Sequence, residues 1–556
     1  MYCQRYEPEN YWAVLGVVSL LPILPAYLLS SYFTSSSHCL FLASVVFLCS
    51  LFTSIILYRL SPLHPLAKYP GPPLWRITKF SAAWYGAQGR YHIKLKALHD
   101  RYGHIVRIGP NELSIIEKDM IPFILGPKGM PKGPLWEGRR LLPSKNYNVN
   151  NSLIGVRDLQ RHSVLRRPWN KAFGTGPLKD YEEMLLARGN FLQTKLEQRC
   201  ESSERGTARI DLTEWMSFFA FDFMGDIAFS SDFSLLDIGD LRRFVGDMAA
   251  AQWLPTILQH VPWLAKLARA TPFLGGTLRK FGDFAVEQAR RRAANPTLKK
   301  DLFHHLLQAA DPDSTSNPLP FIISNAVLTI LAGSDTTSSA LSSTFYYLLR
   351  NPGTYKQLQG EIDDSCEGDE IPSPDRLAQL PHLNAVINEA LRMQPPVPTS
   401  IQRAPMRGSG GRMLGSMFIP EGTNVQVPPY AIHRDPRYFS PNPDSFWPDR
   451  WLQRGPLLPL NEERIASDRE TNGSDIKGVE VVTERDAFIP FATGPTGCVG
   501  KPLAMMELRY VVALLVKKFE MRFSDGFKAE EWEAGLTDRL TLFRGPLYVD
   551  STRRQS

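Results

Sequence analysis

One cysteine lies in a short loop that could hold it in place for metal chemistry. Residues 491–500 read FATGPTGCVG, with Cys498 near the end of the loop and a helical pattern over residues 501–519 directly after it. Gly494 and Gly500 carry no side chain where the backbone and a flat ligand would come close together. The amide groups at the start of the following helix would point at the sulfur and lower the pKa of the thiol. This pattern favours a thiolate that ligates a metal beside a flat ligand, and the alternative is a buried structural cysteine in a chance Gly-rich loop.

A second set of chemically competent residues interrupts a long apolar helix. Residues 332–337 read AGSDTT inside a helical pattern over residues 321–349. A threonine hydroxyl in such a helix can bond backward to a carbonyl and open the helix locally. Gly333 would leave space above a flat ligand, and Asp335 with Thr336 could relay protons through ordered water. A helix kink beside a satisfied polar pair explains these residues equally well.

Three charged residues could brace such a site. Glu389 and Arg392 are three residues apart and therefore share one face of a helix that ends before Pro395. Arg450 follows in the segment FWPDRW at residues 446–451. Such a pair usually lies on a solvated helix face. A supporting role for these residues is therefore inferred only from their order and spacing relative to Cys498.

In this order the motifs resemble those of the cytochromes P450, from about residue 65 to the C-terminus. The loop is similar to the family's haem-binding signature at Phe491, Gly494, Cys498 and Gly500. Thr496 stands where the family usually has a basic residue that pairs with a haem propionate. The resemblance implies that Cys498 is the axial ligand of the haem iron and places one propionate contact in question.

The resemblance also implies roles for the other motifs. Asp335 and Thr336 would form the acid–alcohol pair that protonates iron-bound dioxygen, with Gly333 in the same groove. Structural support beneath the haem would come from three interlocked residues: Glu389, Arg392 and Arg450.

Two arginines would bind the haem propionates if the resemblance holds. Arg166 lies in HSVLR, where the family often has Trp-x-x-x-Arg and where His162 replaces the tryptophan. Arg403, in IQRAP, lies where a second propionate-binding arginine is common. The alternative for both is an ordinary surface arginine. His433 in HRDP is expected to support a turn rather than to bind haem.

The overall composition limits the classes of partner. The net charge of +7 and the pI near 8.9 suit an anionic membrane surface or an acidic protein. No zinc-finger, RRM-like or helix-turn-helix signature is present, so we expect no nucleic-acid partner. The six cysteines form no C-x-x-C pair, which is typical of a reducing compartment rather than of a disulfide framework.

The N-terminus carries two apolar stretches. Residues 11–29 are interrupted by Pro22 and Pro25, whereas residues 40–58 contain no charge and are long enough to span a bilayer. Arg59 and Lys68 follow the second stretch and predict a cytosolic flank. One span or two stays open. We predict an anchor over residues 1–60, a proline-rich hinge over 61–73 and a catalytic domain over 74–556.

Helical patterns dominate after the hinge. Residues 82–102, 179–200 and 321–349 show helical periodicity, and strand-like pieces at 105–108 and 113–116 flank a turn at 109–111. We therefore predict a mainly α fold with small β-sheets, and the resemblance implies a single haem-binding domain of the cytochrome P450 fold. Residues 461–485 are predicted to form a surface insertion. The sequons at Asn150 and Asn472 should be unused if the domain faces the cytosol.

The implied activity is a haem-thiolate monooxygenase reaction. The cofactor would be haem b, the co-substrate O₂, and the electron source NADPH through a membrane-bound NADPH–cytochrome P450 reductase. A docking patch for that reductase, or merely a solvated helix face, is formed by four residues after the loop: Lys501, Arg509, Lys517 and Lys518. The resemblance to fungal microsomal enzymes implies a membrane location, in the endoplasmic reticulum, with the catalytic domain facing the cytosol.

The expected substrate is a lipophilic small molecule that is hydroxylated or epoxidised, as in terpenoid tailoring within fungal secondary metabolism. Four segments would line its pocket by analogy with the family: residues 130–156, 233–273, 395–401 and 540–543. Two alternatives are a haem-thiolate isomerase, dehydratase or peroxygenase that needs no reductase, and a non-enzymatic membrane haem protein. The presence of Asp335 and Thr336 argues against both.

Overall fold

The computed structural model describes most of the chain. The described ranges are residues 11–33, 35–139, 152–203, 206–240, 244–265, 276–295, 299–309, 319–400, 402–452 and 481–554. The sequons at Asn150 and Asn472 and most of the predicted insertion therefore lie outside the described residues.

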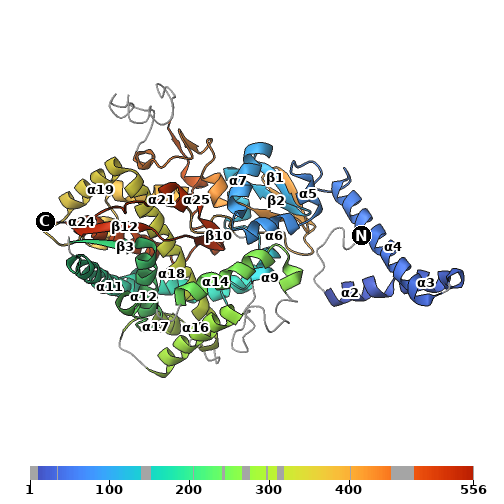
Figure 1. Cartoon of the computed structure of the whole chain (residues 1–556), viewed down its shortest axis with the longest axis horizontal. Helices are drawn as coiled ribbons and strands as arrows, with labels where there is room; N and C mark the ends of the chain where they lie inside the picture. The colour runs from blue at the N-terminus through green and yellow to red at the C-terminus, as the bar shows by residue number, and fades with distance from the viewer. Residues whose placement is uncertain are drawn as a thin grey trace.

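The N-terminal helices project from one end of the molecule (Figure 1). They are α2 (Tyr11–Leu20), α3 (Ile23–Leu29) and α4 (Ser36–Leu60), and α3 packs against α4. Two helical stretches are long and apolar enough to cross a membrane, Leu15–Tyr32 and Ser36–Leu60. Most of their side chains face outward rather than into the protein, as expected of segments that meet lipid.

The proline-rich hinge is fixed to the globular part. Leu66 is buried in the hinge, and the backbone N–H of Arg107 donates to the carbonyl of Pro70 at 2.7 Å. A Cβ at Gly71 would lie 2.2 Å from the carbonyl oxygen of Arg107, so only glycine allows this close approach. The hinge between α4 and α5 (Pro73–Ile77) is therefore packed against the globular part.

Two three-stranded sheets flank the helical body. In the first, β2 (Glu112–Ile115) pairs antiparallel with β1 (Ile105–Gly109) and parallel with β6 (Asn424–Gln426). In the second, β12 (Tyr548–Arg553) lies between β3 (Thr207–Asp211) and β9 (Phe519–Phe523), antiparallel to both. The described two-stranded pairs are β4 (Gly411–Leu414) with β5 (Met417–Pro420), β7 (Phe439–Ser440) with β8 (Val482–Thr483), and β10 (Thr537–Arg539) with β11 (Thr541–Phe543).

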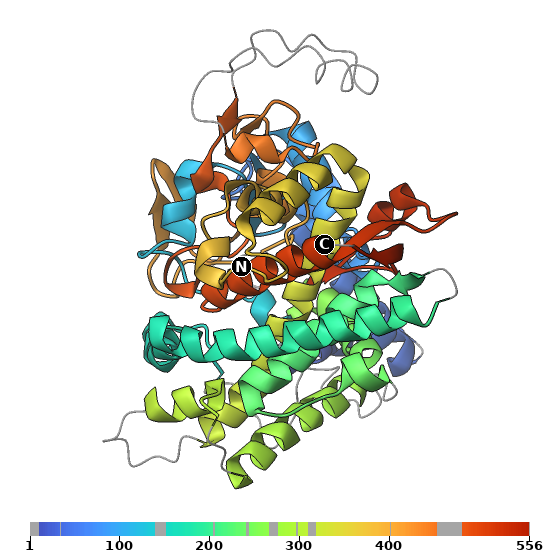
Figure 2. The same ribbon diagram turned by 90° about the vertical axis from the view of Figure 1, so that its left-hand side faces the viewer.

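A long central helix organises the core. This helix, α18 (Leu319–Arg350), packs against α12 (Leu212–Phe229), α24 (Lys501–Lys518) and α21 (Pro381–Met393). In Figure 2 the long helices α24 in red and α11 (Thr175–Glu201) in teal lie side by side. The side chains between these helices form one continuous apolar cluster, which holds α18 and the start of α24 in fixed relation.

Further helices cover this core. They are α6 (Phe80–Ala87), α7 (Tyr91–Tyr102), α8 (Ile121–Ile124), α9 (Leu135–Arg139), α10 (Leu159–Ala172), α13 (Leu235–Ile238), α14 (Phe244–Leu258), α16 (Gly276–Ala294), α17 (Leu302–Ala309), α19 (Pro352–Ser365), α20 (Pro374–Leu377), α22 (Pro429–Ile432) and α25 (Ala529–Ala534).

The element predictions are mostly confirmed. The helices predicted over 179–200, 321–349 and 501–519 correspond to α11, α18 and α24, and the two predicted strands form the β1–β2 hairpin. The single helix predicted over 82–102 is wrong. It breaks into α6 and α7 at Gly89, whose φ of +68° ends a right-handed helix.

Candidate active site

The loop around Cys498 is fixed by its own backbone. The N–H of Cys498 donates to the carbonyl of Phe491 at 2.9 Å, which closes the loop just before α24 begins. Gly494 has a φ of +71°, and a Cβ there would lie 2.3 Å from the carbonyl oxygen of Leu125. Gly494 therefore serves the turn and a close backbone contact, rather than making room for a ligand. A Cβ at Gly500 would lie 3.9 Å from the Cys498 sulfur, so this glycine does keep the space beside the sulfur open.

The side chain of Cys498 is exposed to solvent, although many protein atoms surround its sulfur. Burial raises the pKa of this thiol above its usual value. The backbone N–H groups of Gly500 and Lys501 and the charge of Arg166 act in the opposite direction without overcoming burial. The prediction that the helix start lowers the thiol pKa is therefore wrong for the net shift, although the predicted N–H groups do act on the sulfur.

The two arginines predicted to bind propionates lie at this loop. Arg166, on α10, donates from Nη1 to the carbonyl of Gly497 at 2.8 Å. Arg403 is buried and donates from Nη2 to the hydroxyl of Thr496 at 2.6 Å. The residue that replaces the family's basic group is therefore bonded directly to an arginine from another segment.

A buried lysine and a histidine extend this group of cations. Lys132 pairs with Arg403 through a backbone bridge, and its Nζ donates to the carbonyl of Ile154 at 2.6 Å. His162 is buried, and its pKa is lowered to about 4 by burial and by the charges of Lys132, Arg166 and Arg403. Sequence reasoning missed Lys132 because no motif surrounds it.

The two arginines of this group have no carboxylate partner among the described residues. Within the described part of the chain, neither Arg166 nor Arg403 forms an ion pair with a carboxylate, and the buried Nε of Arg403 has no hydrogen-bond partner. Buried charges normally have such partners. The donor set therefore fits a flat ligand with two carboxylates, and the haem propionates have this chemistry.

The predicted brace is present as a buried ion-pair cluster. Arg392 donates from Nε and Nη2 to the two oxygens of Glu389, both at 2.8 Å, and Arg450 donates from Nε to Glu389 at 3.0 Å. All three side chains are fully buried. Burial alone would raise the pKa of Glu389, but Arg392 and Arg450 hold it below its usual value.

The brace ties α21 to the segments that lead to the cysteine loop. Glu389 also accepts from the backbone N–H of Trp447 at 2.8 Å and from Nε1 of Trp451 at 2.9 Å. His433 is buried, and its Nε2 accepts from the N–H of Ile489 at 2.9 Å, which confirms the predicted structural role. These contacts position the chain just before Phe491.

The interruption in α18 has the predicted backward bond. The hydroxyl of Thr336 donates to the carbonyl of Ala332 at 2.6 Å. Ala332 is exposed and Thr336 half-buried in a helix whose neighbouring residues Ser334, Asp335 and Thr337 are buried. One face of this turn is therefore open to a ligand.

Gly333 also serves helix packing. A Cβ at this position would lie 2.3 Å from the sulfur of Met224 on α12. The small residue therefore permits close packing of two helices, and its predicted place above a flat ligand stays a prediction.

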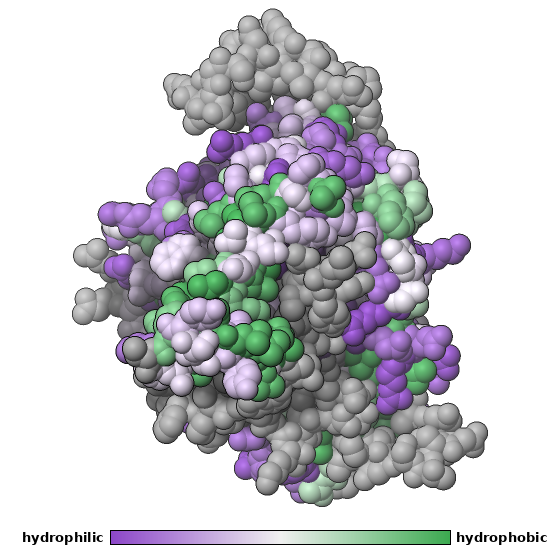
Figure 3. Space-filling model, turned by 90° about the vertical axis from the view of Figure 1, so that its right-hand side faces the viewer, coloured by the Kyte–Doolittle hydropathy of each residue, from purple (hydrophilic) through white to green (hydrophobic). Residues whose placement is uncertain are grey.

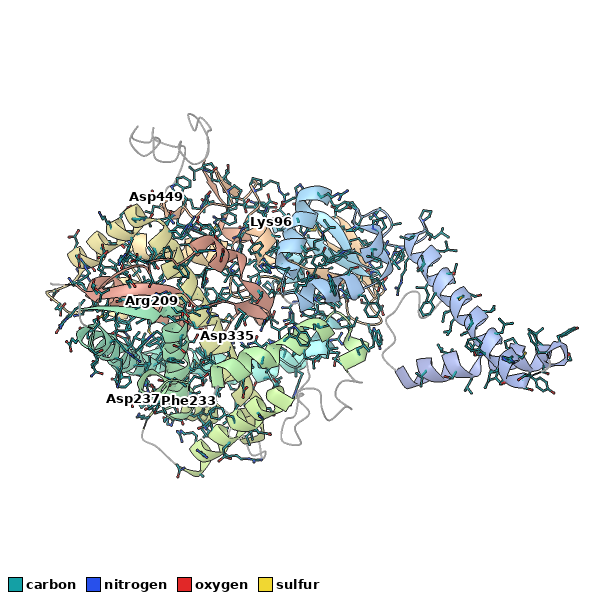
Figure 4. All side chains as sticks on the ribbon, in the orientation of Figure 1. Lys96, Arg209, Phe233, Asp237, Asp335 and Asp449 are labelled. Atoms are coloured by element: carbon teal, nitrogen blue, oxygen red, sulfur yellow. The ribbon has the colours of Figure 1, made fainter. Side chains whose placement is uncertain are left out.

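Asp335 (Figure 4) is buried and belongs to a polar cluster with residues from other segments. Its carboxylate accepts hydrogen bonds from the Thr541 hydroxyl and, at 3.2 Å, from Nε2 of Gln252. Arg544 pairs with its other oxygen at 3.5 Å. Gln252 comes from α14 and Thr541 from β11, so two predicted substrate-pocket segments meet at this carboxylate.

The predicted pocket segments converge only in part within the described residues. The N–H of Leu542 donates to the carbonyl of Pro396 at 2.8 Å, and the carbonyl of Leu542 accepts from Ser339 on α18. These contacts bring residues 540–543 and the start of 395–401 to the central helix. Residues 140–151, 241–243, 266–273 and 401 of the predicted segments lie outside the described residues.

Two of the four residues of the predicted docking patch pair with carboxylates. Lys517 pairs with Asp363 at 3.0 Å and Lys518 with Asp369 at 2.6 Å. Arg509 donates to the side-chain oxygen of Asn384 at 2.7 Å. Of the four residues, Lys501 is exposed and keeps its charge over the ring of Phe491.

Comparison with known proteins agrees with these contacts. The cytochrome P450 family model matches residues 70–537. The chain is 31% identical to a tryprostatin B 6-hydroxylase of Neosartorya fischeri over 100% of this chain and 94% of the relative. It is 33% identical to cytochrome P450 67 of Uromyces fabae, with 89% and 87% covered, and 32% identical to cytochrome P450 monooxygenase orf5 of Eupenicillium brefeldianum, with 91% and 95% covered.

The family match includes the end of the hinge, α18, the Glu389 brace and the cysteine loop. The match, the mainly helical fold with small sheets and the named monooxygenase relatives support one classification. The chain belongs to the cytochrome P450 family and is a monooxygenase of the kind found in fungi.

Proposed function

We propose that Cys498 is the axial thiolate of a bound haem b and that the enzyme hydroxylates or epoxidises a lipophilic small molecule. The observation that carries this proposal is the group of cations beside the Cys498 loop, in which Arg166 and Arg403 have no carboxylate partner among the described residues. A ligand that brings two carboxylates next to a fixed thiol satisfies both features at once.

Arg166 and Arg403 would hold the two propionates, with Lys132 adding positive charge. Thr496 would act through Arg403, because its hydroxyl accepts from Nη2 and fixes the guanidinium in place. His162, with its pKa lowered to about 4, stays neutral at cellular pH and fills the space that a tryptophan occupies in many family members.

Bound haem supplies activation of dioxygen and transfer of one oxygen atom to the substrate, with the second oxygen released as water. The protein would deliver protons on the side of the haem opposite Cys498, through Thr336 and Asp335. The Thr336 hydroxyl donates its hydrogen bond to the Ala332 carbonyl, so its oxygen can accept a hydrogen bond from water or a bound ligand. Asp335 would deliver protons from the polar cluster of α14 and β11.

The substrate proposal follows from the relatives and the pocket segments. One relative is named for 6-hydroxylation of tryprostatin B, so we propose hydroxylation of a fungal secondary metabolite as the reaction class. Terpenoid scaffolds, inferred by analogy, are the substrate class proposed first for screening.

The same proposal includes a membrane and an electron donor. The helices Leu15–Tyr32 and Ser36–Leu60 support anchoring in the endoplasmic reticulum membrane, with Arg59 and the catalytic domain on the cytosolic side. NADPH–cytochrome P450 reductase would supply the electrons, and Lys501 is an exposed member of the predicted patch that would contribute to docking.

The test is a reconstituted reaction with reductase, NADPH and ¹⁸O₂ over a panel of terpenoid and indole compounds. Product that carries one ¹⁸O atom and depends on NADPH supports the monooxygenase proposal. Product that forms without reductase would favour an isomerase, dehydratase or peroxygenase. A haem-loaded protein that binds panel compounds but converts none of them would favour the non-enzymatic haem protein.

A further inference from the structure

A groove lined by aromatic rings lies between α5, α6 and α7. Its volume is about 470 Å³, and it is separate from the Cys498 loop and α18. The apolar part of the lining includes Leu74, Trp75, Phe80, Trp84 and Leu98. Stacking of Trp75 on Tyr91, with ring centroids 6.1 Å apart, fixes the floor of the groove.

Two cations stand along one edge of this groove. Lys94 and Arg101 lie seven residues apart on α7, so they share one helix face and are separated by about 10 Å along the axis. Within the described part of the chain neither forms an ion pair, and each lies over a ring, Tyr85 at 5.2 Å and Tyr102 at 5.3 Å. Lys96, on another face of α7 (Figure 4), is neutralised by Asp100 at 3.1 Å.

The groove lies where the anchor meets the globular part. The guanidinium of Arg59, in the last turn of α4, donates to the carbonyl of Ile77 at the end of α5. The groove residues therefore lie close to the end of a membrane-spanning helix. In lipid bilayers this level is the headgroup region, where anionic phosphates meet water.

The surface around the groove is unusually apolar for one that faces water. Leu74 is 60% exposed and Trp84 64% exposed, and exposed Phe80 packs edge-on against exposed Trp263 at 6.3 Å. Figure 3 faces the end of the molecule from which α2, α3 and α4 project, and it shows apolar residues in green among hydrophilic residues in purple on that side. Exposed patches of this kind, rich in tryptophan, mark surfaces that enter a membrane interface.

We propose that this groove binds the headgroup of an anionic phospholipid. The phosphate and its acidic substituent would lie between Lys94 and Arg101, and the glycerol and upper acyl chains would contact Leu74, Trp75 and Trp84. Phosphatidylcholine has no net charge, whereas an anionic phospholipid carries excess negative charge, so the two cations favour the anionic lipid. The inference rests on the proposed membrane anchoring but not on haem binding.

The test uses the full-length protein in phosphatidylcholine vesicles that contain a trace of spin-labelled phosphatidylserine or spin-labelled phosphatidylcholine. Electron spin resonance then measures the fraction of each label that the protein immobilises. We expect the protein to prefer phosphatidylserine by about fivefold for each cation, with the preference falling as salt is added. The double variant Lys94→Gln/Arg101→Gln should lose this preference.

The matched control is Arg209→Gln/Lys356→Gln. Arg209 is an exposed arginine over the ring of Tyr548 at 5.2 Å, at the end of the molecule away from the anchor (Figure 4), and Lys356 is an exposed lysine on α19. This control should keep the preference. The single variants Lys94→Gln and Arg101→Gln should each lose part of it, which keeps the test decisive if the double variant does not fold.

Two results would overturn the proposal. The first is an unchanged lipid preference in the groove variant; if reductase-supported haem reduction is slower in that variant alone, the groove is a protein-docking site instead. The second is an equal loss of preference in the control, which would indicate general charge attraction. The lipid signal does not depend on bound haem, so it separates this inference from the proposed function.

Discussion

At the scale of single residues, Arg403 takes over a contact that the cysteine loop itself does not provide. Its Nη2 is bonded to Thr496, it is buried, and burial lowers its pKa to about 10, so it is still charged at neutral pH. A buried guanidinium fixed in this way is a preorganised partner for an anionic ligand.

Replacing Arg403 by Leu should therefore weaken haem binding. We expect haem to dissociate about 10- to 100-fold faster, the size of a lost charge-assisted bond. Transfer of haem to an excess of apomyoglobin, followed in the Soret region, measures this rate. Arg434→Leu is the control, since Arg434 is also buried but pairs with Asp444. Equal dissociation rates in wild type and Arg403→Leu would contradict the propionate assignment.

Thr336 makes a second prediction at this scale. The variant Thr336→Ala should keep NADPH consumption but divert it to peroxide, so that product per NADPH falls about tenfold or more. Thr344 on the same helix makes the same backward bond, to Ala340 at 2.7 Å, but is buried in the core. Thr344→Ala should therefore leave coupling unchanged. Coupling that is equal in both variants would remove Thr336 from the proton path.

At the scale of elements, the buried Glu389 cluster joins α21 to the segment before the cysteine loop. Replacing Glu389 by Gln should leave Arg392 and Arg450 without their counter-charge and lower the free energy of unfolding by about 3–5 kcal/mol. Chemical denaturation followed by circular dichroism measures this loss. Glu531→Gln, which removes an exposed pair with Lys528, should cost less than about 1 kcal/mol. Similar losses in the two variants would show that the brace contributes little.

The elements also show how far sequence reasoning reaches. Apolar periodicity predicted α11, α18 and α24, and motif order predicted the Glu389 brace, because each depends on local pattern. The break at Gly89 and the role of Gly333 against Met224 depend on a left-handed φ and on a neighbouring helix. Lys132, Gln252, Thr541 and Arg544 reach the site from distant segments, so no local motif could have identified them.

At the scale of the whole molecule, buried neutral histidines should make the fold sensitive to acid. Burial lowers the pKa of His92 to about 3 and that of His99 to about 4. The unfolded state, with histidine pKa near 6.5, binds more protons below that pH, so stability falls as pH drops from about 6.5 toward 4. Each residue should cost roughly 3 kcal/mol at pH 4.

Urea unfolding between pH 7.5 and 4.5 tests this expectation. His92 packs edge-on against Tyr430 at 4.8 Å, so His92→Phe preserves the packing and should flatten the pH dependence. An identical slope in wild type and His92→Phe would show that this histidine does not titrate on unfolding.

The most direct test of the central claim is the reduced, carbon-monoxide-bound difference spectrum of the full-length protein in membranes. We expect a Soret band near about 450 nm, the position of thiolate-ligated haem. Cys498→Ser should abolish it, whereas Cys366→Ser, at a half-buried cysteine outside the loop, should retain it. A band near about 420 nm in folded wild-type protein, or an unchanged band in Cys498→Ser, would contradict the assignment of Cys498 as the iron ligand.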